Sequence, residues 1–296
     1  MSERATPGTV WRVRGRDVPL DRPVVLGILN VTPDSFSDGG RWRDPGAAVD
    51  RALALSAQGA DLVDVGGEST RPGAEPVDAR EEWSRIGPVV KALAGAGVPV
   101  SLDTTKGEVA GRGLDEGAVA VNDVSGLRFD PGIADLCARA GAGLVLMHMR
   151  GDPRTMQADP DYGDLVGEVA RFLASQASLA GRRGVEPERI VVDPGIGFGK
   201  SVAGNLELLA RCDAFASLGY PVLVGPSRKS FIGKVLDLPV GERLEGTIAA
   251  CVAGLFRGAR LFRVHDVGPV RRALDLAEAI RRSVPDPDAG ATEAVA

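Results

Sequence analysis

The chain has 296 residues, of which 44% are hydrophobic and 25% charged, a composition typical of a folded globular protein. Its formal net charge is −5 and no block of basic residues occurs, so electrostatics give no support for binding to nucleic acid or to an acidic membrane. No apolar run reaches the roughly 18 residues that span a bilayer, and residues 1–10 lack the apolar core of a signal peptide. We therefore expect a cytoplasmic protein.

Three cysteines, Cys137, Cys212 and Cys251, lie far apart in apolar, helix-like segments. They form no CxxC pair and no cluster with histidine, so neither a zinc site nor a disulfide framework is expected. The pattern indicates buried free thiols in a reducing compartment.

Residues 9–19 are expected to form a β-hairpin that closes the bottom of the fold. After it, eight short apolar segments alternate with longer segments of helical periodicity. The apolar segments are 24–30, 61–65, 99–103, 118–123, 143–148, 189–193, 221–225 and 260–265, and the clearest helical patterns are 45–58, 80–94, 164–184, 246–258 and 267–283.

Continuous apolar strands that alternate with helices predict a parallel sheet covered on both faces. Eight such units in about 250 residues predict an α/β fold closed into a (β/α)₈ TIM barrel, with an open, doubly wound sheet as the alternative. We expect one barrel domain over residues 9–283. Residues 1–8 and the Pro/Ala-rich tail 284–296 are predicted to be disordered.

Nearly every predicted strand ends in a polar residue. These residues are Asn30, Asp64, Asp103, Asn122, Asp123, His148, Asp193, Ser227, Arg263 and His265. In a TIM barrel the carboxyl ends of the strands meet at one mouth, where active sites lie. A single such residue, for example Asp103 or Asp123, is equally explained as a helix N-cap. Polar residues at the same end of nearly every strand are hard to explain by capping alone, and they predict an enzyme.

Six segments together resemble the dihydropteroate synthase family. They are GILNVTPDSFSDGG (27–40), DVGGESTRPGA (64–74), VNDVSG (121–126), VVDPGIGFGK (191–200), LVGPSRKSFIG (223–233) and FRVHDV (262–267). The resemblance implies a pterin-binding TIM barrel and a transferase of folate biosynthesis. Its small-molecule substrates would be p-aminobenzoate and 6-hydroxymethyl-7,8-dihydropterin pyrophosphate. It also implies a homodimer formed through late helices, and inhibition by sulfonamides, which mimic p-aminobenzoate.

The resemblance implies which residues bind the pterin. They are Asp103, Asn122, Asp193, Phe198, Lys229 and Arg263. A buried carboxylate such as Asp193 can accept two adjacent N–H groups of the pyrimidinone edge. Arg263 is a flat cation that can stack on the ring and face the phosphates. His148 is expected to line this pocket without a catalytic role.

The pyrophosphate contacts implied by the resemblance are Asn30, Arg263 and His265. Arg263 and His265 are two positions apart, so both side chains lie on one face of the strand. Asn30 would ligate the Mg²⁺ that accompanies the pyrophosphate. Magnesium keeps several waters, so a single side-chain oxygen is plausible and a protein cage is not expected.

Two long loops, 31–42 and 66–76, are rich in Gly, Pro, Ser and Asp and resemble the loops that order over the pyrophosphate in the family. The p-aminobenzoate contacts implied are Thr70, Arg71 and Pro72 of the second loop, with Ser230 at a helix start. Asp34 of the first loop would lie beside the cationic methylene carbon. With Lys229 and Arg263 it completes the expected catalytic set.

The segment GIGFGKS (195–201) looks like a P-loop but does not match one, because Pro194 stands where that motif requires glycine. Two other functions remain as alternatives. A methyltetrahydrofolate–corrinoid methyltransferase could share the pterin contacts, but it would not need either loop motif. A catalytically inert paralogue could bind a pterin without turning it over.

Overall fold

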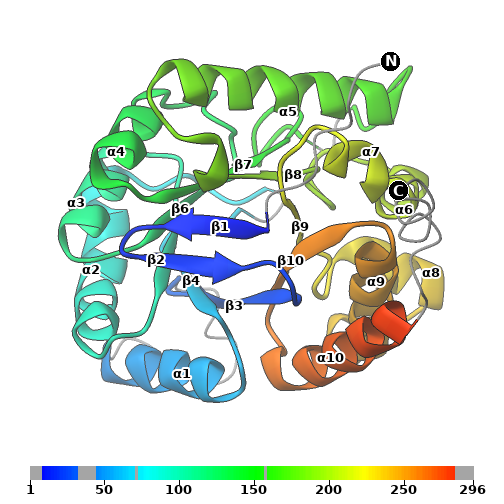
Figure 1. Ribbon diagram of the computed structural model, residues 1–296, viewed down its shortest axis with the longest axis horizontal. Helices are drawn as coiled ribbons and strands as arrows, with labels where there is room; N and C mark the ends of the chain where they lie inside the picture. Colours follow the sequence, from blue (N-terminus) through cyan, green and yellow to red (C-terminus); the bar gives the residue numbers. More distant parts are fainter. Residues whose placement is uncertain (1–8, 33–44, 71–72, 157–158, 284–296) are drawn as a thin grey trace, which may run out of the picture.

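The computed structural model describes residues 9–32, 45–70, 73–156 and 159–283. Within them eight parallel strands close into a barrel in the order β10-β3-β4-β5-β6-β7-β8-β9, which confirms the predicted TIM barrel (Figure 1). The strands are β3 Val24–Asn30, β4 Leu62–Gly66, β5 Val100–Asp103, β6 Ala120–Asp123, β7 Gly143–Met147, β8 Ile190–Asp193, β9 Val222–Val224 and β10 Ala259–Val264. The two tails predicted to be disordered, 1–8 and 284–296, lie outside the described residues.

Helices form a ring outside the strands (Figure 1). They are α1 Pro45–Ala57, α2 Ala79–Gly95, α3 Gly107–Asp115, α4 Gly132–Ala140, α5 Leu165–Arg182, α6 Val202–Ala210, α7 Cys212–Ala216, α8 Ser230–Leu236, α9 Leu244–Phe256 and α10 Val267–Ser283, with short 3-10 turns at η3 Pro187–Arg189 and η4 Val240–Glu242. Side-chain caps begin several of them. Asp78 accepts from the Glu81 N–H at α2, and Asp164 accepts from the Gly167 N–H at α5.

The strands are buried on both faces, which explains their continuous apolar sequences. One face packs against the helix ring. The other fills the barrel interior, where Leu26, Leu62, Val145, Val191 and Leu261 meet in a single cluster.

The N-terminal hairpin, β1 Val10–Val13 and β2 Arg16–Pro19, lies across one end of the barrel (blue in Figure 1). The Trp11 side chain is fully buried in the interior cluster, and its Nε1 donates to the Arg189 carbonyl at 2.9 Å. The Arg14 N–H donates to the Val119 carbonyl at 3.1 Å. Both acceptors just precede a strand, so the hairpin closes the bottom, as predicted.

The opposite end of the barrel gathers polar residues in one layer. Strand register pairs Asn30 with Gly66, Gly66 with Asp103, and Asp103 with Asn122. These residues come from four neighbouring strands, so the sequence pattern of polar strand ends translates directly into one rim.

The three cysteines are buried and free, as expected. No helix in the described part of the chain is long and apolar enough to cross a membrane.

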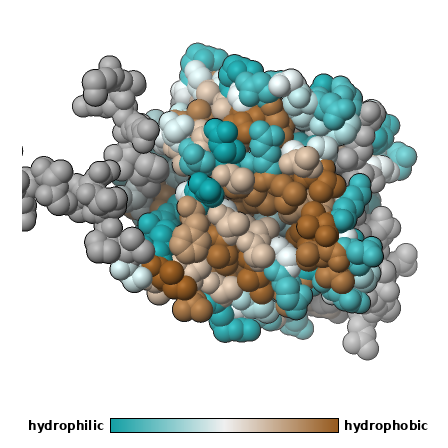
Figure 2. Space-filling model, turned by 90° about the vertical axis from the view of Figure 1, so that its right-hand side faces the viewer, coloured by the Kyte–Doolittle hydropathy of each residue, from teal (hydrophilic) through white to brown (hydrophobic). Residues whose placement is uncertain are grey.

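Figure 2 looks onto the right-hand side of Figure 1, where hydrophobic side chains gather on the surface. Exposed apolar residues of the helices there are Leu206, Val235, Leu236, Phe256, Leu276 and Ile280, with Val240 in η4.

Candidate active site

Arg263 lies at the centre of the buried polar layer. Its Nε is 2.5 Å from Asp64 Oδ2, and its Nη2 is 2.6 Å from Asp103 Oδ2. Asp64 is fully buried and Asp103 nearly so. Burial raises the pKa of Asp103 to about 7, although the Arg263 guanidinium acts in the opposite direction. The arrangement pairs one cation of β10 with two acids on the adjacent strands β4 and β5.

Asp64 and Asn122 leave hydrogen-bond acceptors without partners. Asn122 Nδ2 donates to Asp64 Oδ2 at 3.0 Å. Asp64 Oδ1 and Asn122 Oδ1 are buried and have no partner among the residues the structure describes. A buried acceptor without a donor costs free energy, so the pair fits a ligand that presents N–H groups.

Lys229 crosses the loop that follows β8. Its Nζ donates to the Ile196 carbonyl and lies 4.4 Å from the centre of the Phe198 ring. A Cβ at Gly197 would be 2.6 Å from Lys229 Cδ, and Gly197 also has φ +84°, so only glycine fits there. Burial lowers the pKa of Lys229 to about 7.

Asp193 ends β8 beside these groups. Its Oδ1 accepts from the Gly195 N–H at 2.7 Å, which shapes the start of the same loop. Burial raises the pKa of Asp193, and among the nearby cations Lys229 acts most strongly against that shift. Asp193, Lys229 and Phe198 therefore belong to one site, with Arg263 close enough to Asp193 to influence its charge.

Lys200 is a buried residue of this loop to which the sequence analysis gave no role. Its Nζ contacts His148 Nδ1 at 3.0 Å and donates to the carbonyls of His148 and Phe198 at 3.1 and 2.8 Å. Burial lowers the pKa of Lys200 well below its ordinary value. Burial also lowers the pKa of His148, to about 2, so His148 is neutral and its Nδ1 accepts the hydrogen bond. Lys200, from the segment that resembles a P-loop without matching one, instead connects the ends of β7 and β8.

Asp64 is a second residue to which the sequence analysis gave no binding role, although it counted Asp64 among the polar strand ends. The carboxylate joins Asn122 to Arg263, which lie 58 and 199 positions away along the chain. Asp123, by contrast, accepts from the N–H groups of Ser125 and Leu127 and so organises its own loop. Asp123 is therefore structural, but it stabilises a turn and caps no helix, since α4 begins only at Gly132.

His265 follows β10 and is held by Ser227. The Ser227 Oγ lies 2.9 Å from His265 Nδ1 and accepts from the His265 N–H at 3.1 Å. Arg228, in the same turn, has φ +57° and pairs with Asp266 at 2.6 Å. The turn that carries Lys229 is therefore fixed to the end of β10.

Asn30 ends β3, between β10 and β4, and its side chain is partly exposed at the mouth. The described residues contain no group of three or more His, Cys, Asp or Glu that could hold a metal. An ion near Asn30 would therefore take most of its oxygen ligands from a substrate and from water, which suits Mg²⁺.

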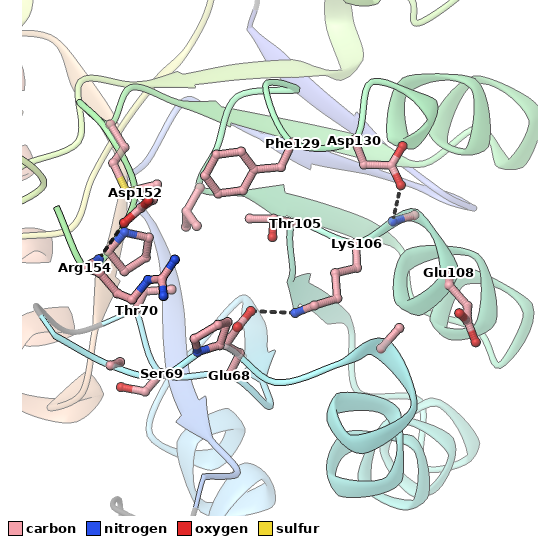
Figure 3. A pocket seen from close by; sticks show the side chains of 17 residues that line it. Glu68, Ser69, Thr70, Thr105, Lys106, Glu108, Phe129, Asp130, Asp152 and Arg154 are labelled. Atoms are coloured by element: carbon pink, nitrogen blue, oxygen red, sulfur yellow. Dashed lines mark hydrogen bonds and ion pairs between the residues drawn. The ribbon is translucent and has the colours of Figure 1, made fainter. Parts of the chain in front are cut away.

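The predicted p-aminobenzoate residues are only partly described. Ser230 begins α8, next to Lys229. Thr70 lines a cavity of about 560 Å³ together with Lys106, Phe129 and Met149 (Figure 3). Asp34, Arg71 and Pro72 lie outside the described residues, so their roles stay predictions.

Comparison with known proteins agrees with this geometry. Residues 26–265 match the family model described as pterin binding enzyme, which is more than half of the chain. A dihydropteroate synthase from Synechocystis is 48% identical over 263 residues, 88% of this chain and 91% of that protein. The chain belongs to the dihydropteroate synthase family. The enzyme from Escherichia coli K12 is 44% identical over 90% of this chain and 94% of its own.

Solved members of the dihydropteroate synthase family share the fold. A structure from Yersinia pestis, described as a sulfonamide drug complex, superposes with a TM-score of 0.88 at 41% identity and covers 92% of this chain and 99% of its own. A structure from Xanthomonas albilineans with 4-aminobenzoic acid has a TM-score of 0.86 at 45% identity and covers 94% and 100%. The family match begins in β3 and ends at His265, so it contains the whole polar rim.

Proposed function

We propose that the chain joins p-aminobenzoate to 6-hydroxymethyl-7,8-dihydropterin pyrophosphate, giving 7,8-dihydropteroate and pyrophosphate. Membership of the family supports this transferase activity. A relative from Burkholderia cenocepacia, 42% identical with a TM-score of 0.84, is described as complexed with 7,8-dihydropteroate. In this chain the proposal depends on one observation: two buried acceptors, Asp64 Oδ1 and Asn122 Oδ1, lack donors beside a layer of acids and cations.

The pterin binds at the closed end of this site. Its pyrimidinone edge presents N–H donors to Asp193 and Asn122, and Asp64 adds the acceptor that the sequence analysis missed. Lys229 donates to acceptor atoms of the ring, and Phe198 packs beside it. Asp103 contributes through Arg263, whose orientation it fixes.

The pyrophosphate end lies toward β3 and β10. Arg263 and His265 bind the departing pyrophosphate, and Ser227 holds the His265 ring in place. Asn30 is the proposed protein ligand for Mg²⁺, which when bound neutralises charge on the phosphates. One amide oxygen at the end of β3 fits an ion held mainly by phosphate and water.

The bond between the methylene carbon and the pyrophosphate oxygen breaks first, because the dihydropterin ring delocalises the resulting cation. The bonding pair leaves with the pyrophosphate. The arylamine nitrogen then attacks the carbon and loses a proton to water. A neutral arylamine is already nucleophilic, so the site needs no strong general base. Asp34 is proposed to stabilise the cationic carbon, and Thr70, Arg71, Pro72 and Ser230 to hold p-aminobenzoate.

We also propose a homodimer formed through the apolar face of Figure 2. Exposed Leu206, Val235, Leu236, Val240 and Phe256 lie on α6, α8, η4 and α9. A contiguous apolar surface of this kind is typical of a subunit interface. The three free cysteines support a reducing compartment, and we place the enzyme in the cytoplasm. Sulfonamides should compete with p-aminobenzoate.

The test is an assay of pyrophosphate release from the pterin substrate, with and without p-aminobenzoate. We expect release that requires p-aminobenzoate and matches dihydropteroate formed one to one. Asp193→Ala should bind no pterin by calorimetry and serves as the inactive control. Pterin binding without release would support the inert paralogue instead, and dependence on a corrinoid partner would support the methyltransferase.

A further inference from the structure

One side chain closes the base of the second loop. Glu68 Oε1 accepts a hydrogen bond from the Val77 N–H at 3.0 Å. The two residues lie nine positions apart, one where the loop leaves β4 and the other just before α2. The bond therefore joins the two arms of the loop and removes conformational freedom that the arms would otherwise have.

The second carboxylate oxygen of Glu68 binds Lys106. Lys106 Nζ lies 2.6 Å from Glu68 Oε2 and 2.7 Å from Glu82 Oε2. In Figure 3 the Lys106 side chain reaches toward Glu68 along the wall of the cavity. Lys106 precedes α3, and Glu82 lies in the first turn of α2. Two successive βα units, β4–α2 and β5–α3, thus meet at one ammonium group, which we call the Lys106 clamp: Glu68, Glu82 and Lys106.

The Lys106 clamp is partly buried, which strengthens its contacts. The Glu82 side chain is fully buried and that of Glu68 is 18% exposed. Burial raises the pKa of Glu82, and the contact with Lys106 acts against that shift. Hydrogen bonds between charged groups in such surroundings are stronger than neutral ones. The position of the Glu68 carboxylate is therefore well determined.

Backbone contacts fix the first arm of the loop to α2. The Arg85 Nη1 donates to the Gly67 carbonyl at 2.8 Å. A Cβ at Gly67 would lie 2.9 Å from the Glu82 carbonyl oxygen, so the two backbones approach as closely as glycine allows. Farther along, the Gly73 N–H donates to the Pro153 carbonyl at 3.1 Å. Thr70 lies between these two anchors, only two positions after Glu68.

We propose that Glu68 is a positioning residue for the second substrate: held by Lys106, it fixes both arms of the loop and thereby sets where Thr70 meets p-aminobenzoate. This inference rests on the proposed function and deepens it. The residues proposed to hold the pterin, Asn122, Asp193 and Lys229, share no hydrogen bond with the Lys106 clamp in the described ranges. Disrupting the Lys106 clamp should therefore change the KM for p-aminobenzoate without changing the KM for the pterin pyrophosphate.

The decisive variant is Glu68→Gln. Its amide oxygen can still accept from Val77, but its amide nitrogen then faces the Lys106 ammonium, and two donors cannot pair. We expect the KM for p-aminobenzoate to rise about tenfold while the KM for the pterin pyrophosphate stays within about twofold. Amide hydrogen exchange of residues 66–70 and 73–77 should become faster.

Glu108→Gln is the matched control. Glu108 lines the same cavity, but its ion pair is with exposed Arg112 within α3, so both KM values should stay unchanged. Lys106→Arg keeps a cation that can bind two carboxylates and should preserve the p-aminobenzoate KM better than Lys106→Met. Thermal unfolding of each variant shows whether it is folded.

Faster exchange in Glu68→Gln with an unchanged p-aminobenzoate KM would overturn the proposal, and so would equal increases in both KM values. A parent enzyme that releases no pyrophosphate would instead contradict the proposed function itself, before any variant is compared. The two failures are therefore distinguishable.

Discussion

The two ends of the barrel are built from the same eight strands but bury opposite kinds of side chain. At the bottom, Trp11 and Val13 of the hairpin pack on apolar strand residues in a cluster without charges. At the mouth, Asp64, Asp103 and Arg263 are buried against one another. Strands such as β5 and β8 thus pass from a closed apolar end to a polar end within a few residues.

This difference separates stability from binding. Burying apolar surface stabilises a fold directly, whereas burying charges costs free energy that the pairing repays only in part. A protein that needed only stability would not keep unpartnered acceptors such as Asp64 Oδ1 at one end. The bottom should therefore respond to mutation mainly in stability, and the mouth mainly in turnover.

The largest effect on turnover should come from Arg263→Met. The change leaves Asp64 and Asp103 buried without their cation and removes a proposed pyrophosphate contact. We expect turnover to fall by at least about a thousandfold, and the free energy of unfolding to fall by about 3 kcal/mol. Steady-state kinetics and urea unfolding measure the two quantities.

Arg260→Met is the control for that experiment. Arg260 lies on the same strand with a similar exposed fraction, 21% against 19%, but it pairs with Glu278 of α10. We expect the free energy of unfolding of Arg260→Met to fall by about 1 kcal/mol or less and its turnover to stay at the parent value. Near-normal turnover of Arg263→Met would show that the mouth is not the reaction site.

Trp11→Ala should have the converse effect at the bottom. It empties a fully buried indole site and removes the hydrogen bond to the Arg189 carbonyl. We expect a loss of about 3–5 kcal/mol in the free energy of unfolding, with kcat and both KM values unchanged at temperatures where the variant is folded. Arg12 is exposed on the same strand, so Arg12→Ala should change neither the free energy of unfolding nor the kinetic constants. A fall in kcat without unfolding would break the separation of the two ends.

The sequence alone predicted the barrel because its evidence is local: apolar runs, helical periodicity and strand ends recur along the chain. The strand 24–30 has the expected bounds, and the other predicted segments differ from the strands by up to two residues at either end. The rim followed from topology, since Asn30, Asp103 and Asn122 had to converge once the strands closed. The pairing of Lys200 with His148 could not be predicted in this way, because it depends on how two loops pack.

The protonation of Lys229 should make the free energy of unfolding depend on pH. Burial lowers its pKa from 10.5 to about 7, whereas the unfolded chain keeps the proton up to the ordinary value. Unfolding therefore takes up a proton between those pH values, and raising the pH from about 7 to about 9 should stabilise the protein through Lys229. Urea unfolding should show the parent gaining on the order of 1 kcal/mol relative to Lys229→Met over that range. Lys234 is exposed. When Lys234 is replaced instead, the difference in free energy of unfolding between parent and variant should not change with pH.

The smallest effect should come from Asp164→Ala, which tests whether every acid that follows a barrel strand belongs to the site. Asp164 caps α5 by accepting from the Gly167 N–H at 3.0 Å, and its ion pair with Arg171 is exposed. Loss of the cap should cost about 1 kcal/mol, because one N–H of the first turn loses its partner. Both KM values and kcat should stay at the parent values. An altered KM would mean that function at the mouth extends beyond the buried layer around Arg263, since Asp164 shares no hydrogen bond with that layer in the described residues.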